Sequence, residues 1–174
     1  SAGRYAAIVG LRECIACPAG RYVATTKASS CLACDVGKFT TETGQTQCAE
    51  CAAGTYASVT GALSCIQCPL GKYQAATGKS ACVDCAAGTY RDTAGGVDCT
   101  DCAPGSYQEK MGQAACAPCA SGKYQSDSKQ TSCVNCDAKT FSLQANGLGA
   151  VTCTSCPVGK QQPYEGQPSC ALCP

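Results

Sequence analysis

The sequence predicts a small disulfide-rich repeat array of short β-hairpins and irregular loops, with about 17 residues per repeat, stacked into an elongated rod. Three observations predict this fold class. The 174 residues include 20 cysteines, a density typical of disulfide scaffolds. Leu, Ile, Val and Phe number only 21, about 12% of the chain, which is too few for an ordinary hydrophobic core. The cysteines form ten Cys-x-x-Cys pairs that recur at a fixed period.

The repeat unit is defined by a glycine and an aromatic residue that keep phase with the cysteines. The pairs recur every 17 residues, except for one step of 20 between Cys133 and Cys153. Glycine comes three residues after the second cysteine of a pair, where we expect φ above zero or a close backbone approach. An aromatic follows two residues later, and we expect its ring to pack on a disulfide or on the adjacent repeat. The aromatics in this position are Tyr5, Tyr22, Phe39, Tyr56, Tyr73, Tyr90, Tyr107, Tyr124 and Phe141. Contacts are expected between nearest-neighbour repeats only.

The register also predicts the domain organisation. Residues 1–13 are a partial repeat without its opening cysteines, 14–136 are regular repeats, 137–156 carry a three-residue insertion, and 157–174 hold the last repeat and the opening of a truncated one. We therefore expect the chain to be a segment of a longer array. No segment has helical periodicity, so each repeat is expected to form a hairpin around its aromatic, with a turn at a second, mid-repeat glycine.

The insertion interrupts this pattern. Lys139 replaces the in-phase glycine there, and a bend or a changed stacking step is expected. Gln161 replaces the next aromatic, and Tyr164 is the candidate substitute for it.

Three uniform pairing schemes fit the cysteine period. Bonds could close within each Cys-x-x-Cys, run from the second cysteine of one pair to the first of the next, or join first to first and second to second. The spacing is also near that of four-cysteine zinc sites. Zinc would couple repeats two by two, and the uniform 17-residue period favours disulfides over zinc. Redox catalysis would require a βαβ context that the chain lacks.

The segment from Cys17-Pro18-Ala19-Gly20-Arg21-Tyr22 to Cys31 resembles the first disulfide loop of a tumour necrosis factor receptor cysteine-rich domain, as does Cys68-Pro69-Leu70-Gly71-Lys72-Tyr73 to Cys82. The tandem array is similar to the ephrin-receptor-like cysteine-rich repeats of large extracellular and cell-surface proteins, some of which are components of flagellar hairs (mastigonemes). The resemblance implies the disulfides Cys17–Cys31, Cys34–Cys48, Cys51–Cys65, Cys68–Cys82, Cys85–Cys99, Cys102–Cys116, Cys119–Cys133, Cys136–Cys153 and Cys156–Cys170. Cys14 and Cys173 would then pair with cysteines outside this segment.

Composition argues against several functions. A formal charge of +1 gives no basic field for nucleic acid, and the chain has no histidine for a triad or a metal site. We expect no cofactor, no metal, no enzyme activity and no membrane span. Asp98 and Asp101 could bind calcium weakly, but solvated loop charge is the favoured interpretation. The aromatic row could be a ligand or glycan platform, although packing between repeats is favoured. The apolar stretch Ile8-Val9-Gly10-Leu11 is a candidate contact.

The functional prediction is an extracellular structural segment: a disulfide-stapled spacer in a surface filament, flagellar hair or coat. The alternative is a cysteine-rich receptor-like ectodomain that binds a protein ligand along its side. Expected partners are flanking repeats of the same longer chain, copies of itself in a filament, and covalently attached glycans. The chain has no Asn-x-Ser/Thr sequon, so the glycans would be O-linked. Candidate positions are Thr25, Thr26, Thr40, Thr41, Thr43, Thr60 and Thr77.

Overall fold

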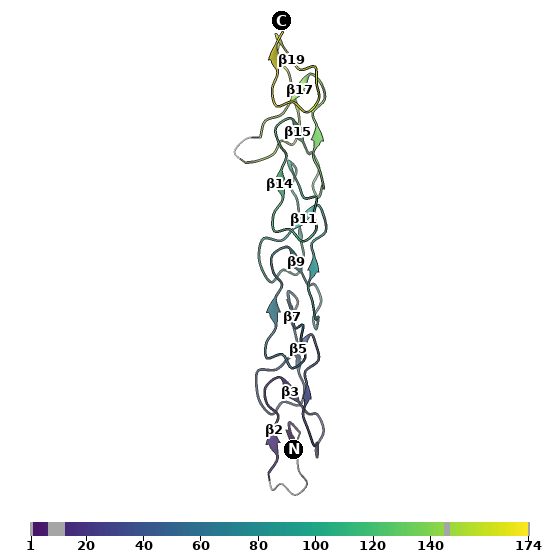
Figure 1. The fold of residues 1–174 in the computed structure, drawn as a ribbon, viewed down its shortest axis with the longest axis vertical. Coiled ribbons are helices and arrows are strands. Elements are labelled where there is room, and N and C mark those ends of the chain that lie inside the picture. Colours follow the sequence, from purple (N-terminus) through teal and green to yellow (C-terminus); the bar gives the residue numbers. More distant parts are fainter. Residues whose placement is uncertain (1, 7–12, 145–146, 174) are drawn as a thin grey trace. The chain divides into compact units, whose positions relative to one another are not determined.

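The structure is a computed structural model that describes residues 2–6, 13–144 and 147–173. The stretch Ile8-Val9-Gly10-Leu11 lies outside the described residues. The described part of the chain contains short antiparallel hairpins of consecutive strands and no helix, and Figure 1 labels strands along the chain. It therefore contains no helix that could cross a membrane.

Each strand is two residues long. The strands are β1 (Arg4–Tyr5), β2 (Ile15–Ala16), β3 (Arg21–Tyr22), β4 (Leu32–Ala33), β5 (Lys38–Phe39), β6 (Ala49–Glu50), β7 (Thr55–Tyr56), β8 (Ile66–Gln67), β9 (Lys72–Tyr73), β10 (Val83–Asp84), β11 (Thr89–Tyr90), β12 (Thr100–Asp101), β13 (Ser106–Tyr107), β14 (Ala117–Pro118), β15 (Lys123–Tyr124), β16 (Val134–Asn135), β17 (Thr140–Phe141), β18 (Thr154–Ser155), β19 (Lys160–Gln161) and β20 (Ala171–Leu172). This confirms the prediction of an all-β array of small hairpins.

The hairpins explain the phase of the sequence repeat. The first strand of each hairpin starts directly after the position of the in-phase glycine. The second strand lies between the two cysteines of the next pair. In the β3–β4 hairpin, Arg21 faces Ala33 and Tyr22 faces Leu32. We therefore define a module as the residues from the second cysteine of one pair to the residue before the second cysteine of the next. Modules 1 to 9 are 17–33, 34–50, 51–67, 68–84, 85–101, 102–118, 119–135, 136–155 and 156–172.

The chain divides into two compact units, which share modules 4 and 5. The first unit comprises Ser1–Pro69, Tyr73–Val83 and Ala94–Asp98. The second comprises Leu70–Lys72, Asp84–Thr93 and Cys99–Pro174. Both units contain the same kinds of backbone contact between modules.

In the first unit, consecutive modules are joined by backbone hydrogen bonds. The amide of Gly20 donates to the carbonyl of Thr40 over 2.9 Å, and the amide of Gly44 donates to the carbonyl of Cys17 over 2.7 Å. Tyr22 also forms a parallel bridge with Gln45. Because these bonds use only main-chain groups, they can recur wherever the backbone conformation recurs.

The second unit repeats this pattern with different side chains. The amide of Gly105 donates to the carbonyl of Gln125 over 2.7 Å, and the amide of Lys129 donates to the carbonyl of Cys102 over 2.8 Å. Tyr124 forms the corresponding parallel bridge with Ala150. The joint between modules is thus set by the backbone and tolerates sequence variation.

The interior of the modules is made of cysteines rather than of large aliphatic side chains. The opening cysteine of every module from the first to the eighth has no exposed surface: Cys17, Cys34, Cys51, Cys68, Cys85, Cys102, Cys119 and Cys136. Many aliphatic residues are exposed instead, among them Ile66 and Val134 in second strands. A chain with so little aliphatic material folds here by placing sulfur atoms where other proteins place leucine.

Candidate functional site

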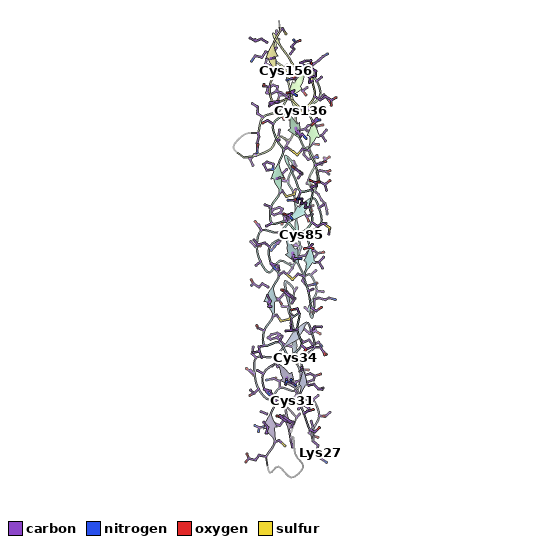
Figure 2. The ribbon with its side chains drawn as sticks, viewed as in Figure 1. Lys27, Cys31, Cys34, Cys85, Cys136 and Cys156 are labelled. Atoms are coloured by element: carbon purple, nitrogen blue, oxygen red, sulfur yellow. A yellow bond between two sulfur atoms is a disulfide. The ribbon has the colours of Figure 1, made fainter. Side chains whose placement is uncertain are left out.

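A disulfide closes each module. In each bond the opening cysteine of a module is joined to the first cysteine of the following pair, with the Cα atoms 5.6–5.8 Å apart. Figure 2 draws these bonds in yellow. The nine bonds are Cys17–Cys31, Cys34–Cys48, Cys51–Cys65, Cys68–Cys82, Cys85–Cys99, Cys102–Cys116, Cys119–Cys133, Cys136–Cys153 and Cys156–Cys170. Cys14 and Cys173 are free and exposed.

The in-phase glycines form a contact between alternate modules. Gly37 of module 2 has a φ of 79° and lies against the backbone of Gly78 in module 4, so that a Cβ at residue 37 would overlap the Gly78 carbonyl. Gly71 and Gly112 make the same contact in the second unit. The expectation that only nearest neighbours touch is therefore wrong, because modules 1 to 7 each also contact the module two places along.

The three-residue insertion leaves this alternate-module contact in place. Gly149 of module 8 lies against the backbone of Gly105 in module 6, in the position that the mid-module glycine holds elsewhere. The backbone changes locally, as the insertion suggested: Gly149 lies outside the left-handed region that the mid-module glycines of other modules adopt, and a Cβ there would overlap the Gly105 carbonyl and the Cys119 amide. Lys139, which replaces the in-phase glycine of this module, keeps the left-handed conformation with a φ of 70°.

All nine in-phase aromatics are partly buried. Two of them lie against described hydrophobic clusters. Tyr5 packs on the cluster that contains Cys17 and Cys31, and Phe39 packs on the cluster that contains Cys51. In both cases the ring covers the disulfide of the module that follows. Tyr164 does not replace a packed aromatic, since its side chain is 70% exposed.

A second interior position follows the aromatic, and sequence reasoning missed it. The residue directly after the aromatic position is buried in most modules, whether apolar or polar: Val23, Thr40, Ala57, Gln74, Gln125, Ser142 and Gln162, the last of which follows Gln161 in place of an aromatic. In module 4, the Gln74 side chain donates to the carbonyl of Ala81 over 2.8 Å and accepts from the amide of Ala76 over 3.1 Å. Gln108, Gln125 and Gln162 bridge their modules in the same way. The side-chain amide of the glutamine thus connects the turn to the residue that precedes the second cysteine of the disulfide.

Polar side chains at the end of the second strand reach the turn two modules along. Thr77 of module 4 donates to a carboxylate oxygen of Glu50 in module 2 over 3.2 Å. The Lys129 ammonium in module 7 lies 3.5 Å from the carboxylate of Asp101 in module 5. Lys129 occupies the mid-module glycine position with a φ of 62°. These contacts are exposed, so each contributes at most about 1 kcal/mol.

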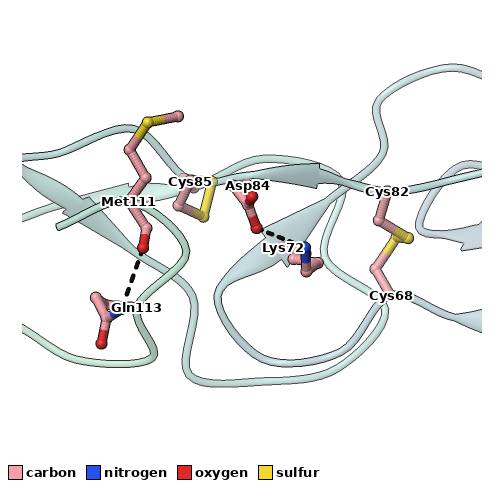
Figure 3. Close-up of polar contacts among 8 residues, drawn as sticks. Cys68, Lys72, Cys82, Asp84, Cys85, Met111 and Gln113 are labelled. Atoms are coloured by element: carbon pink, nitrogen blue, oxygen red, sulfur yellow. Dashed lines mark hydrogen bonds and ion pairs between the residues drawn. A yellow bond between two sulfur atoms is a disulfide. The ribbon is translucent and has the colours of Figure 1, made fainter.

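An ion pair also joins the two strands of some hairpins. The Lys72 ammonium lies 2.6 Å from the Asp84 carboxylate across β9 and β10, as Figure 3 shows. Nearby, the Gln113 side chain donates to the carbonyl of Met111 within its own turn. Among the described residues, no three or more Cys, Asp or Glu residues are gathered as a metal site. Of the acidic residues considered for calcium, Asp101 is paired with Lys129 and Asp98 has interactions of its own.

The candidate O-glycan positions differ in accessibility. Thr40 is only 7% exposed, because it occupies the interior position after the aromatic, and its hydroxyl donates to the carbonyl of Glu42. It is therefore a poor glycan acceptor, which corrects the prediction at this residue. The remaining candidates are exposed: Thr25, Thr26, Thr41, Thr43, Thr60 and Thr77.

The hairpins, the buried disulfides and the backbone joints define a disulfide-stapled repeat segment of an extracellular protein. The family model described as tyrosine-protein kinase ephrin type A/B receptor-like matches four overlapping stretches, residues 3–45, 37–81, 71–112 and 105–147. These matches cover most of the chain, which therefore belongs to this family of ephrin-receptor-like cysteine-rich repeats. The matched repeat is a non-catalytic type of domain. No curated protein matches the chain.

Proposed function

We propose that this segment is a structural spacer in a larger extracellular protein, a rod that forms part of a surface filament, flagellar hair or coat. The observation that carries the proposal is the joint between modules, which is made of main-chain hydrogen bonds at every step and varies little with the side chains. A spacer needs such uniformity, because its length has to be set by the number of modules.

The disulfides supply the mechanical property that a spacer requires. Each regular bond spans 14 residues and holds its two Cα atoms about 5.7 Å apart. Under tension, an oxidised module extends to about 16 Å, whereas a reduced module of 17 residues extends to about 58 Å. The covalent path therefore limits extension even after the hydrogen bonds have broken.

Single-molecule force spectroscopy on the whole chain tests this function. Pulling the oxidised chain from its ends should give a short maximal extension, and reduction should add about 40 Å for each regular disulfide. Small-angle scattering of the oxidised chain should give an elongated particle, and one that remains elongated when salt is raised. A compact particle in solution would contradict the spacer function, whatever the pulling experiment shows.

We also propose that Cys14 and Cys173 bond to cysteines of flanking modules. Cys14 is the first and Cys173 the second cysteine of its Cys-x-x-Cys pair, and both positions are disulfide-bonded in all the remaining pairs. Here both cysteines are free and exposed. In this segment, iodoacetamide without denaturant should alkylate these two thiols only. Alkylation of further cysteines would show that the proposed pairing of the array is incomplete.

We propose that the exposed threonines carry O-linked glycans, as is expected of a surface filament. Thr41 and Thr43 lie in the exposed part of one turn, two residues apart. Intact mass of the chain purified from its own source should show hexose or pentose increments on the peptides that contain them. Unmodified mass on all of these peptides would remove glycans from the proposal.

A further inference from the structure

Shallow cavities recur between the aromatic of one module and the strand of the next. The cavity at Tyr22 has a volume of about 140 Å³ and is lined by Asp35, Lys38 and Gln47 of the next module. The cavity at Tyr107 is lined by Glu109 and Lys123 together with hydroxyl side chains. These regular cavities carry charges of both signs and are accordingly well suited to water.

The cavity at Tyr90 differs because the insertion in module 8 adds a further wall. Its volume of about 510 Å³ equals that of the Tyr107 cavity and is within the range of ligand sites, and it lies wholly in the second unit. The lining, not the size, distinguishes it. Besides Tyr90 and residues of module 6, it is lined by Gly147, Leu148 and Val151. The side chains of Leu148 and Val151 are 73% and 47% exposed. The insertion thus adds Leu148 beside the cavity without burying it. Val151 stands at a regular register position, which is also aliphatic in modules 3 and 5.

Module 6 contributes a second apolar wall at the same place. Pro118 lies at the end of its second strand, where modules 2 and 4 carry Glu50 and Asp84, and Pro118 lines the cavity together with Pro104. Ser106 stands at the strand position that holds Lys38 and Lys72 in those modules. The charged pair of those two hairpins is therefore absent here, as it is in module 3, where Thr55 and Gln67 hold the same positions. Proline, tyrosine and aliphatic residues line the cavity at this side.

Asp92 is the one charged residue that lines this cavity. The lining by Tyr90 and two prolines suits an extended apolar segment, as aromatic-lined grooves do for extended peptides. The carboxylate on the lining favours a positive charge next to the apolar group. We propose that this cavity binds an extended peptide segment of a partner protein, in which an aliphatic or aromatic side chain stands next to lysine or arginine.

A library of random 12-residue peptides displayed on phage tests the site with no partner chosen in advance. Phage that bind a variant lacking residues 146–148 are first removed from the library. The remaining phage are then selected for binding to the whole oxidised chain. This deletion restores the 14-residue disulfide spacing of the other modules and removes Leu148 while keeping Gly149 in register. Disulfide-mapped peptides that show the same nine pairings as the whole chain establish that the variant has folded.

The expected result is enrichment of peptides with an apolar residue adjacent to lysine or arginine. Asp92→Asn should weaken their binding by about tenfold at low salt and less at high salt. Gln47→Ala, in the regular Tyr22 cavity, should leave binding unchanged. If the deletion variant does not form nine disulfides, the double substitution Leu148→Ser and Val151→Ser takes its place.

Three outcomes would overturn the proposal: no enrichment on the whole chain, enriched peptides that bind the deletion or double variant equally well, or enriched peptides without a basic residue. None of these outcomes bears on extension under force, so the site and the spacer function can fail separately.

Discussion

At the residue scale, the in-phase glycines carry the tightest constraint in each module. Gly37 combines a φ of 79° with a backbone neighbour in the place of a Cβ. Gly37→Ala should therefore destabilise modules 2 to 4 by about 3 kcal/mol or more, because strain in φ and steric overlap add. Hydrogen exchange of the amides in residues 34–84 measures the loss locally, because it reports the opening of each segment separately.

Gly159 separates the two causes of that loss. Its φ is 82°, but a Cβ there would meet nothing within 4 Å. Gly159→Ala should therefore cost only about 1–2 kcal/mol, the penalty of the left-handed conformation alone. Equal effects at residues 37 and 159 would show that the alternate-module contact contributes nothing to stability.

The buried amide of Gln74 is a second residue on which a module depends. Gln74→Ala removes both of its hydrogen bonds and leaves the carbonyl of Ala81 and the amide of Ala76 without these partners. The expected loss is about 1–3 kcal/mol, and the Ala76 amide should exchange faster. Gln113→Ala provides the control, because the hydrogen bond of its side chain lies at the surface and stays within its own turn. Unchanged exchange at residue 76 would contradict the role assigned to Gln74.

The glycine and aromatic positions could be predicted from sequence, while the Gln74 position could not. Glycine and tyrosine recur in phase, so their conformation and packing follow from the period. The position after the aromatic holds Val23, Thr40, Ala57 and Gln74 in successive modules, and no residue type reveals that it is interior. Glutamine is also usually exposed in proteins, which directs attention away from it.

At the element scale, the module is a hairpin closed by a disulfide and tied to two successors. Gly37 and Gly78, which touch, are 41 residues apart, more than two periods of the sequence. A period of 17 residues states how often a module recurs but not how far the chain turns from one module to the next. The alternate-module contact was therefore beyond prediction from the sequence, although the hairpins themselves were predicted.

The disulfide of a central module should matter locally. Replacing both Cys51 and Cys65 with alanine removes a bond that spans 14 residues, at an expected cost of about 3 kcal/mol. Exchange should increase in module 3 and in the modules that contact it, and remain unchanged in modules 7 to 9. The control is Cys14→Ser with Cys173→Ser, which removes free thiols only. A loss of protection in every module would show that the array unfolds as one cooperative body.

The turn of module 7 allows a stabilising change. Lys129 has a φ of 62°, where glycine stands in most modules, and its ammonium reaches the exposed carboxylate of Asp101. Lys129→Gly removes the backbone strain of a lysine in the left-handed conformation, but it also removes an exposed ion pair. Because the strain is the larger of the two, the free energy of unfolding should rise by about 0.5 kcal/mol. Asp101→Asn alone removes the pair and should lower stability slightly at low salt only. Destabilisation by Lys129→Gly at high salt would mean that the lysine stem itself packs usefully.

At the scale of the whole molecule, contacts to the next two modules set the shortest length that can fold. Modules 1 and 2 alone would keep the bond from Gly20 to Thr40 but lack the contact from Gly20 to Gly61 in module 3. A fragment of residues 17–50 should thus be poorly protected from exchange, and one of residues 17–67 should be the first to show protected amides. Adding modules beyond module 3 should not raise the protection of module 1 any further. In an array whose modules contact only the next two, module 1 has no contact with module 4 or later modules. Oxidised fragments of two, three and five modules, compared by exchange at the amide of Gly20, measure this directly. Full protection in the two-module fragment would show that the disulfide and the nearest neighbour suffice, and that the alternate-module contact only sets geometry.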